Sequence, residues 1–563
     1  MSVGRVLDPE DFPQETVPAV KDGVRGPRRN TSTTPATKLD LAAERGAPAQ
    51  ADDASSSRVA MAGAWGLLGR GLMLVANLLA TPFTIRLLGP ARYGLWSVLQ
   101  SALSLAATSD VSMGPATTKL GADTYARRDS HGESAVVWTA VGITIATAMP
   151  IAIALTIFAP EVVKLFHVHS ELMSSGVVAL RVGCSIFMLQ SIAGILSTSP
   201  QVRLEWRAYT FISTSSNLIA SVGPPAALAL FAGGLVTASF VVLASSFLMA
   251  AGNLVLAIRV QPQLRLPRFD RAIMKQLLSF GGPLTIATVL LMPLMTAERL
   301  FLAGNHSTTV VAYWAAAATL ATTLVVLPEQ LVGPLMPALA RLETEGSFDE
   351  VSKLFHRAMA GIFLIATPMA ILLALVAQPF LTIWAGPQYG VHSTLLLLIA
   401  IPGVWLDCFN WVAQTYLISS SRPKVIAYMR GAQVVPYVLA AWVLTDKFGA
   451  TGAALVWSGR LVVETLVLFR IVRQTAPLRM SLLSERKFAS IAGPLALCGA
   501  VVAIMLVSQG LIVRVCCAAG LSVLYALACW RLILAPRERQ GILGLVDEAL
   551  RRGSLPRHGR RSN

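Results

Sequence analysis

Charged residues are scarce in this sequence of 563 residues. Asp, Glu, Lys and Arg together make up 13% of the chain, whereas hydrophobic residues make up 54%. This balance excludes a soluble protein of several domains, which would carry about twice that share of charge. Because a bilayer core of roughly 30 Å takes about 20 apolar residues per helix, the composition predicts an all-α polytopic membrane protein without a large soluble domain.

Several signals of cofactor or metal chemistry are also lacking. The six cysteines all lie in apolar segments, which predicts small core residues and neither a disulfide framework nor a zinc site. His167 and His169 stand in a predicted loop without a third ligand. The GLLGRG run at Gly66 to Gly71 lies in a predicted membrane helix with no strand before it, and no Walker motif is visible. We therefore expect no cofactor, no metal, no direct use of ATP and no enzymatic activity.

The net charge of +16 is distributed in a way that favours a topology signal over nucleic-acid binding. Loops after even-numbered apolar runs carry twenty Lys and Arg residues, and loops after odd-numbered runs carry five. The five are Arg86, Arg92, Lys164, Lys447 and Arg514. By the positive-inside rule, both termini are predicted to be cytoplasmic and no nucleic-acid partner is expected.

The apolar runs predict about fourteen transmembrane helices. An N-lobe over 58–260 would hold six spans, at about 61–86, 93–113, 135–158, 175–199, 208–231 and 234–258. A C-lobe over 261–474 would hold six more, at about 278–302, 308–333, 357–378, 393–419, 423–444 and 449–471. A terminal helix pair over 475–535 and a basic cytoplasmic tail over 536–563 complete the prediction.

Residues 1–57 are rich in Pro, Ser, Thr and Ala and show almost no apolar periodicity. Such a segment cannot bury enough apolar surface to offset the entropy of ordering it, so we expect a disordered cytoplasmic tail. Met61 stands at the edge of the first span, and initiation there is an alternative to a natural tail.

Internal duplication is the second organisational signal. The stretch Ile85 to Gly114 leaves one apolar run through an Arg and a Gly-Pro turn, and Glu298 to Ala317 repeats that pattern more weakly. The segments 203–260 and 422–474 both begin with a basic loop and turn on Gly, in AGGLVTAS and FGATGAALV. These repeats predict two pseudo-repeated lobes of six spans, with substrate held at the interface between them.

Five patches in order carry a resemblance that covers about residues 61–474. They are RLLGPARYGLWSV, SDVSMG, ERLFLAG with AYWAAA, LVGPLMPALARLETEGSFDEV and GATGAALVWSGRLVVETLVLFRI. The sequence resembles the polysaccharide-transport (O-antigen and exopolysaccharide flippase) family of the multidrug/oligosaccharidyl-lipid/polysaccharide exporter superfamily. The resemblance implies two bundles of six helices around a central cavity, which together move lipid-linked oligosaccharides across the bacterial inner membrane, and a final helix pair in many members.

Two departures from the family limit what the resemblance carries over. Family members commonly have Asp where this chain has Glu298. The lipid II flippase branch has an Asn-Ser and Arg-rich first helix that is not found near Trp65 to Asn77, which argues against a peptidoglycan precursor as the substrate. The drug-exporting branch shares the fold and stays open as an alternative.

Charged residues within predicted spans are the candidates for function, because a charge in hydrocarbon costs at least about 2.5 kcal/mol on insertion scales. The predicted substrate-binding set is Arg70, Arg299, Arg181, Arg430 and Arg460. Arg suits a diphosphate because its planar fork donates to two oxygens at once. Arg70 and Arg299 rank first, since spans 1 and 7 occupy equivalent places in the two lobes. The alternative is that each Arg is paired structurally or snorkels to the membrane interface.

Carboxylates within or beside the spans are candidates for ion coupling, since such groups can take up and release protons. They are Glu298, Asp407 and Asp110, with helix capping as the alternative for Asp110. Arg460 and Glu464 are spaced i, i+4, which predicts an intrahelical ion pair. Glu298 and Arg299 are adjacent and should point about 100° apart, towards different partners.

The leading hypothesis is a secondary flippase or exporter of a polyprenyl-pyrophosphate-linked oligosaccharide that works by alternating access. Its expected partners are membrane lipids and, in surface polysaccharide synthesis, a polymerase and glycosyltransferases. One alternative is an exporter of drugs or organic cations, for which an anion-lined cavity would be expected. Another is a membrane glycosyltransferase or polymerase, but the outer loops are short and lack a convincing acid–base set.

Overall fold

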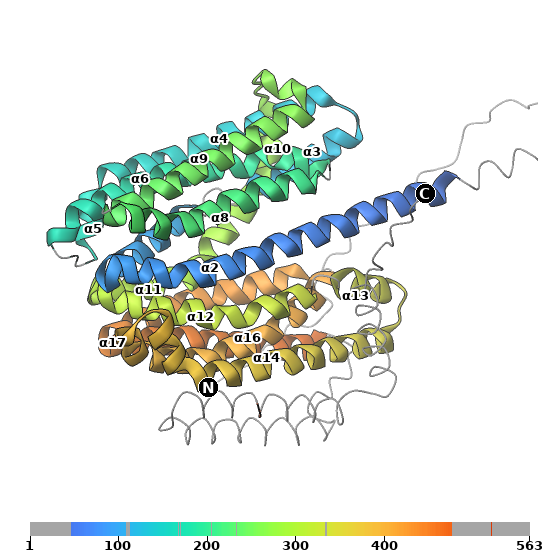
Figure 1. The fold of residues 1–563 in the computed structure, drawn as a ribbon. Coiled ribbons are helices and arrows are strands. Elements are labelled where there is room, and N and C mark those ends of the chain that lie inside the picture. Colours follow the sequence, from blue (N-terminus) through green and yellow to red (C-terminus); the bar gives the residue numbers. More distant parts are fainter. Residues whose placement is uncertain are drawn as a thin grey trace, which may run out of the picture. The chain divides into compact units, whose positions relative to one another are not determined.

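The computed structural model describes residues 47–107, 113–166, 168, 170–203, 205–231, 233–332, 335–420, 422–475 and 520. The chain divides into two units, Met1–Arg58 and Val59–Asn563, and the second contains all the described helices except the start of the first. Asp110, nearly all of the predicted terminal pair and the tail over 536–563 lie outside the described residues. Within the described residues every regular element is a helix, as the sequence predicts (Figure 1).

The helices of the N-lobe follow the predicted spans with small shifts of boundary. They are α2 (Ala47–Ala107), α3 (Met113–Ala126), α4 (Ser130–Ile157), α6 (Ser170–Leu196), α8 (Trp206–Leu230) and α9 (Gly234–Val260), with short α5 (Ala159–Lys164), α7 (Thr198–Val202) and η1 (Pro262–Arg265) between them. Spans 1 and 2 form α2, which bends at Gly89. α2 begins at Ala47, within the predicted tail.

The spans predicted for the C-lobe are also helical, with one span divided. Its helices are α10 (Arg271–Leu291), α11 (Pro293–Asn305), α12 (Thr308–Val332), α13 (Leu335–Thr344), α14 (Phe348–Trp384), α15 (Pro387–His392), α16 (Thr394–Ser419) and α17 (Pro423–Thr475). The seventh span is broken between α10 and α11, because Pro293 has no backbone N–H to continue the helical ladder. Spans 11 and 12 form α17, which bends at Gly449.

Glycines with positive φ turn the chain at corresponding places in the two lobes. Gly234, between spans 5 and 6, has φ +61°, and Gly449, between spans 11 and 12, has φ +58°. Residues with a Cβ adopt this region at a steric cost, so both turns favour glycine. The two Gly-containing sequences from which the duplication was inferred therefore share a backbone feature.

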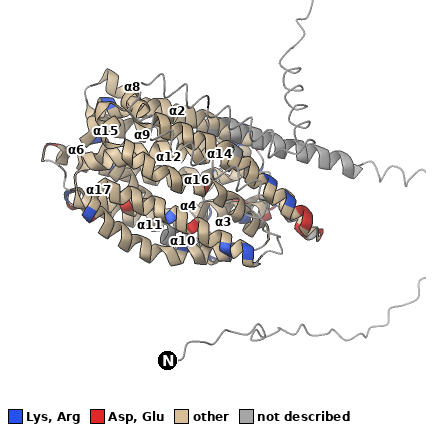
Figure 2. Ribbon diagram, turned by 90° about the horizontal axis from the view of Figure 1, so that it is seen from below, with Lys and Arg blue, Asp and Glu red and all other residues tan. Residues whose placement is uncertain are grey.

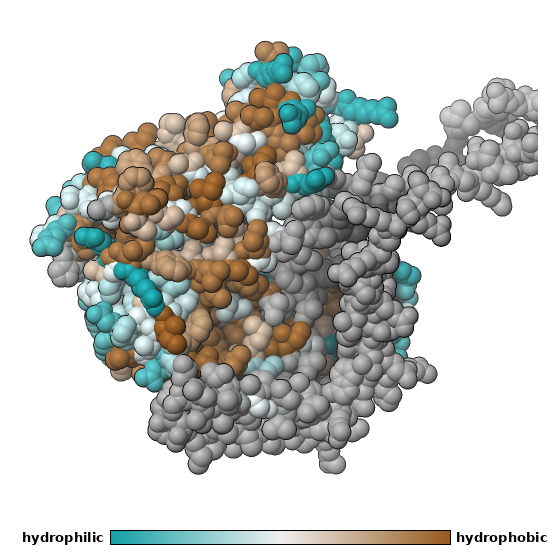
Figure 3. Space-filling model, viewed as in Figure 1, coloured by the Kyte–Doolittle hydropathy of each residue, from teal (hydrophilic) through white to brown (hydrophobic). Residues whose placement is uncertain are grey.

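The surface of the helices is suited to lipid. Seven helices among the described residues are long and apolar enough to cross a membrane. Figure 2 shows long uncharged stretches along the helices, with most charged segments near helix ends, and Figure 3 shows broad hydrophobic areas on the surface. These features confirm a polytopic all-α membrane protein, while the number of fourteen spans stays a prediction.

The helices have two chemically different ends. We call the end with Gly89, Gly234, Gly386 and Gly449 the turn end, and the end with Arg203, Arg265, Arg341 and Arg422 the basic end. At the turn end, one hydrophobic core joins N-lobe residues such as Leu95 to C-lobe residues such as Trp314. The two lobes are thus packed together at this end.

The RLLGPARYGLWSV stretch is built for that packing. Gly89 has φ +75° and bends α2, and a Cβ on Gly94 would overlap the Thr308 carbonyl at the start of α12. Arg86 donates a hydrogen bond to the carbonyl of Ile383 in α14, and the neighbouring Trp384 donates its Nε1–H to the carbonyl of Leu78 at 2.9 Å. Only glycine permits the close approach at position 94, so this stretch links the two lobes.

Candidate functional site

α11 brings two charged side chains into the interior of the C-lobe. Glu298 is 1% exposed, and its carboxylate accepts a hydrogen bond from the Tyr437 hydroxyl of α17 at 2.8 Å. Arg299 Nε lies 4.0 Å from Glu298 Oε1 and is buried without a hydrogen-bond acceptor in the described part of the chain. The prediction that these neighbours turn to different partners is wrong for Arg299, whose guanidinium lies against the Glu298 carboxylate, while Glu298 also binds Tyr437.

α17 folds back at Gly449, which sets its two halves side by side and brings two arginines to one carboxylate. Arg460 Nη1 lies 3.0 Å from Glu464 Oε2, which confirms the predicted i, i+4 pair. Arg430 Nε lies 3.1 Å from the other oxygen of the same carboxylate, and Arg430 Nη2 donates to Gln414 at 2.9 Å. The Glu464 side chain is 2% exposed, so its charge is neutralised inside the lobe.

Tyr437 connects these two groups of charges. Its hydroxyl binds Glu298, and the Arg460 guanidinium lies over its ring, 5.7 Å from the ring centroid. This distance is within the range of cation–π attraction. One aromatic side chain thus stands between the carboxylate of α11 and the ion pairs of α17.

Asp407 adds a third carboxylate from α16. Its Oδ1 accepts a hydrogen bond from Asn410 at 3.1 Å, and it is close enough to Arg430, Arg460 and Glu464 to interact with them electrostatically. We call Glu298, Arg299, Asp407, Arg430, Arg460 and Glu464 the C-lobe cluster. It holds three arginines and three carboxylates, all within predicted membrane spans.

Of the other predicted site residues, only Arg181 has a described side chain, and it lies apart from this cluster. Arg181 of α6 is exposed and donates from Nε to the carbonyl of Thr156 at 3.3 Å. Thr156 is in the last turn of α4, where carbonyls lack helical partners, so Arg181 caps that helix. Arg70 lies on α2, but its side chain is outside the described residues, as is Asp110.

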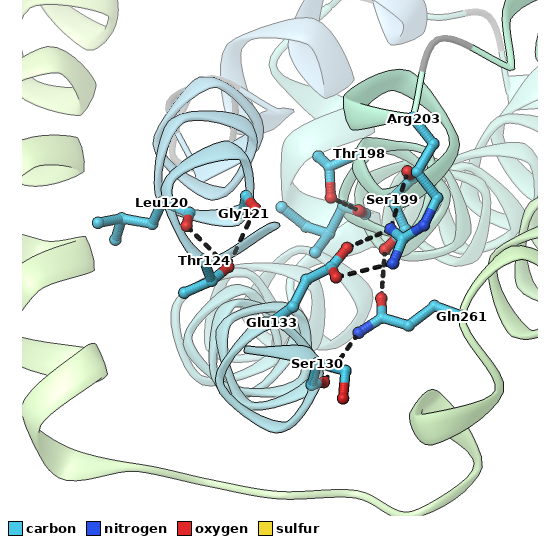
Figure 4. Close-up of polar contacts among 10 residues, drawn as sticks. Leu120, Gly121, Thr124, Ser130, Glu133, Thr198, Ser199, Arg203 and Gln261 are labelled. Carbon is cyan, nitrogen blue, oxygen red and sulfur yellow. Dashed lines mark hydrogen bonds and ion pairs between the residues drawn. The ribbon is translucent and has the colours of Figure 1, made fainter. Parts of the chain in front are cut away.

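A second polar site, which the sequence analysis did not predict, lies at the basic end of the N-lobe. The Arg203 guanidinium faces both carboxylate oxygens of Glu133, one of them at 2.8 Å (Figure 4). Arg203 also lies over the Tyr125 ring, 4.9 Å from its centroid, and the Gln261 amide contacts the Ser199 hydroxyl nearby. The sequence placed Arg203 only among the topology-marking charges, because its partner Glu133 is 70 residues away.

This N-lobe site borders a cavity of about 410 Å³ that is also lined by Arg128 and Ser130. Glu133 lies in the first turn of α4, where a negative charge is favoured by the helix dipole. The Glu133 side chain is 3% exposed and Arg203 is 15% exposed, so the pair ties α4 to the α7–α8 connection.

Neither site has the form of a metal centre. Across the described ranges, no three His, Cys, Asp or Glu side chains lie close enough to hold a metal ion. His167 and His169 fall outside those ranges. What both sites offer is guanidinium groups beside carboxylates, an arrangement that can bind anions or exchange protons.

Comparisons with known proteins agree with this architecture. A family model described as "Polysaccharide biosynthesis protein" matches residues 84–394. A protein of Shigella flexneri that is provisionally named an O-antigen transporter is 23% identical over 412 residues, which cover 72% of this chain and 95% of the relative.

Two kinds of solved structure share the fold. A lipid II flippase, MurJ, in an inward closed conformation has a TM-score of 0.64 at 11% identity and covers 82% of this chain and 98% of its own. An inward-facing multidrug resistance transporter of the MATE family and MOP superfamily has a TM-score of 0.61 at 14% identity, covering 73% of this chain and 96% of its own. At these identities the likeness concerns the fold alone.

Proposed function

Because the chain belongs to the polysaccharide biosynthesis protein family, we propose that it flips or exports a lipid-pyrophosphate-linked oligosaccharide across the bacterial inner membrane. The name of the Shigella flexneri relative and the flippase among the structural neighbours support this function. In this proposal the chain is a secondary transporter for surface polysaccharide synthesis. Both termini are cytoplasmic, and a polymerase and glycosyltransferases act on the same pathway.

The observation that carries the proposal is the C-lobe cluster. Six charged groups inside membrane helices are costly in free energy. Apolar side chains of similar volume would pack in the same space at a lower cost. Arg299 and Arg430 keep 29% and 28% of their side chains exposed, so neither side chain is fully enclosed by the helices around it. Permanently charged, planar donors of this kind are suited to the two phosphates of a lipid pyrophosphate.

The balance of charge within the cluster supports a coupling role. Three arginines face three carboxylates, so an arriving pyrophosphate competes with the carboxylates for the guanidinium groups. A carboxylate released from its arginine is uncompensated in a medium of low dielectric constant, where proton uptake neutralises it. Glu298 and Asp407 are the proposed sites of this uptake, and Tyr437 holds Glu298 in place.

Alternating access requires that the turn end open. With cytoplasmic termini, the turn end faces the periplasm, and the described contacts between Gly94 and Thr308 and between Trp384 and Leu78 close it. These contacts would separate when substrate leaves on the periplasmic side. Arg86, which binds the Ile383 carbonyl, is a part of this closure and not of the substrate site.

The direct experiment measures flipping of a fluorescent lipid-linked oligosaccharide in proteoliposomes. We expect Arg299→Gln and Arg430→Gln each to slow flipping at least about tenfold, since a charge-assisted hydrogen bond of about 1.5–3 kcal/mol is lost. Arg341→Gln removes the same charge from the exposed helix α13 and should leave the rate unchanged. A wild-type rate equal to that of protein-free vesicles, or full activity in both cluster variants, would refute the proposal.

Ion coupling is tested in the same vesicles with an imposed proton gradient. Glu298→Gln and Asp407→Asn should lose the acceleration that the gradient gives to the wild type, because neither amide can carry a proton. If both variants respond to the gradient as the wild type does, these carboxylates are not the coupling groups, although the flippase assignment would stand.

A further inference from the structure

The connection between α9 and α10 is held against α4 by several hydrogen bonds. Trp138 Nε1 donates to the carbonyl of Leu264 at 2.9 Å, and the Ser134 hydroxyl donates to that of Gln263 at 3.2 Å. The backbone N–H of Asp270 donates to the Thr139 hydroxyl at 3.2 Å. The connection is therefore a platform at the basic end with a defined position on the N-lobe.

This platform carries basic and apolar side chains together. Arg265, Arg268, Arg271 and Lys275 are all exposed. The only acid among residues 265–275, Asp270, caps α10 by accepting a hydrogen bond from the N–H of Ala272 at 2.7 Å. Leu266 and Phe269 are 65% and 68% exposed beside these charges, and Figure 3 shows hydrophilic and hydrophobic surface next to each other where α9 meets α10.

Below the platform, a groove of about 590 Å³ runs between α4 and α10. Its walls are mainly apolar and include Ile143 and Ala146 from α4 and Met274 and Leu278 from α10. Phe269 roofs it by packing on Gly142, where a Cβ would lie 2.8 Å from the ring. Arg271 lies at its mouth, one turn from Met274 and Lys275 on the same face of α10.

We propose that this groove binds an anionic phospholipid of the membrane, with an acyl chain between α4 and α10 and the headgroup on Arg268, Arg271 and Lys275. The two halves of the site match the two halves of such a lipid: an apolar slot in the membrane and a cluster of cations at its surface. Basic clusters beside membrane helices attract anionic lipids at roughly 1 kcal/mol per Lys or Arg.

A phospholipid fits this groove better than the transported oligosaccharide lipid does. The hydrogen-bonding side chains of the groove are Thr139, Thr147, Asp270 and Arg271, and Asp270 is already engaged in capping α10, which leaves few groups to hold sugar hydroxyls. Arg271 at the mouth, with Arg268 and Lys275 nearby, suits a compact phosphate group. The groove is also separate from the C-lobe cluster, which lies on α11, α16 and α17.

The position of α10 gives the bound lipid a structural consequence. α10 contacts α3 and α4 of the N-lobe and also α17 of the C-lobe. A lipid wedged between α4 and α10 would stabilise the arrangement in which α10 rests on the N-lobe. The content of anionic lipid in the membrane would then influence how the lobes move.

The test is photolabelling in phosphatidylcholine vesicles that contain a small fraction of phosphatidylglycerol with a diazirine in its acyl chain. Adducts on α4 and α10 are quantified by peptide mass spectrometry. We expect wild-type adducts at Ala146, Met274 or Leu278, and a decrease of at least about tenfold in the triple variant R268Q/R271Q/K275Q, which removes three headgroup contacts. Ala146→Trp, which fills the groove and keeps its charges, should abolish the same adducts.

Matched variants separate this site from general effects of charge and bulk. K424Q/R470Q/R473Q removes three exposed charges from α17, and Ala229→Trp adds the same bulk to an exposed position of α8, so both should label as the wild type does. Equal labelling by a diazirine phosphatidylcholine, or labelling that survives both groove variants, would overturn the proposal. Displacement of the probe by lipid-linked oligosaccharide but not by phosphatidylglycerol would assign the groove to the substrate instead. None of these readouts depends on transport, so they stand apart from the flippase test.

Discussion

The two lobes share a helical plan but use buried charge differently. In the N-lobe the buried pair is Glu133 with Arg203, at the basic end of the helices. In the C-lobe, Glu464 is shared by Arg430 and Arg460 well inside α17, and Glu298 and Asp407 lie nearby. A pair at a helix end needs no partner beyond itself, whereas a cluster inside the membrane must be satisfied throughout or exchange ions.

This contrast suggests a division of roles between duplicated halves. The N-lobe pair joins α4 to the α7–α8 connection and is satisfied by its own residues. The C-lobe cluster keeps two arginines partly open and leaves the buried Nε atoms of Arg299 and Arg460 without acceptors among the described residues. The ligand-responsive chemistry is therefore expected in the C-lobe, and substitutions in each lobe can test that assignment.

The largest effect is expected from Glu464→Gln. The substitution leaves two guanidinium groups without their shared carboxylate inside the membrane, so the free energy of unfolding should fall by about 3 kcal/mol. Unfolding in mixed micelles with increasing SDS measures this loss. Glu464→Gln combined with Arg460→Met removes one of the two unpaired guanidinium groups and should recover part of the free energy of unfolding.

Glu345→Gln serves as the control for this change. Glu345 pairs with Arg341 at the same i, i+4 spacing, but the two side chains are 46% and 79% exposed. Exposed pairs are screened by water, so this substitution should leave unfolding unchanged. If Glu464→Gln also left the free energy of unfolding unchanged, the charges of the C-lobe cluster would contribute no more to stability than an exposed ion pair does.

Glu133→Gln is expected to have a smaller effect on stability and none on ion coupling. The substitution leaves the Arg203 guanidinium without its carboxylate partner at the end of the helices. Because Arg203 is 15% exposed and Tyr125 still covers it, we expect the free energy of unfolding to fall by about 2 kcal/mol. In proteoliposomes the folded fraction should keep the wild-type response to a proton gradient. A lost response would move part of the coupling chemistry into the N-lobe and break the contrast between the lobes.

The sequence predicts the helices better than it predicts the clusters. Apolar runs and Gly-Pro turns predict α8, α9, α12 and α16 to within a few residues, because a membrane helix is defined by composition over its whole length. The starts of α2 and α14, at Ala47 and Phe348, lie well before the predicted starts at 61 and 357, because composition does not mark where a helix continues beyond its apolar run. The broken seventh span was missed because Pro293 stands inside a continuous apolar run, and membrane helices often tolerate proline without breaking.

Long-range partners are what the sequence could not supply. The pair Arg460 and Glu464 was predictable, since both lie on one helix at i, i+4 spacing. The hydrogen bonds from Tyr437 to Glu298 and from Arg430 to Gln414 join separate helices or distant turns, and no local pattern marks them. The same holds for Glu133 and Arg203, and for Arg181, whose capping of α4 depends on how α6 packs beside it.

The smallest effect on stability is expected at the glycine turns that the two lobes share. Gly234→Ala and Gly449→Ala each place a Cβ on a backbone with φ near +60°, without a severe clash at either position. Each should lose about 1–2 kcal/mol of unfolding free energy from backbone strain alone. Gly459→Ala, at an exposed helical position with open space around it, should be neutral or stabilising by up to about 1 kcal/mol. Similar losses in the two lobes, measured in the same SDS titration, would mark these turns as equivalent parts of a duplicated scaffold. A loss confined to Gly449 would instead tie that turn to the C-lobe cluster, since Gly449 is the point at which α17 folds back and brings Arg430 to Glu464.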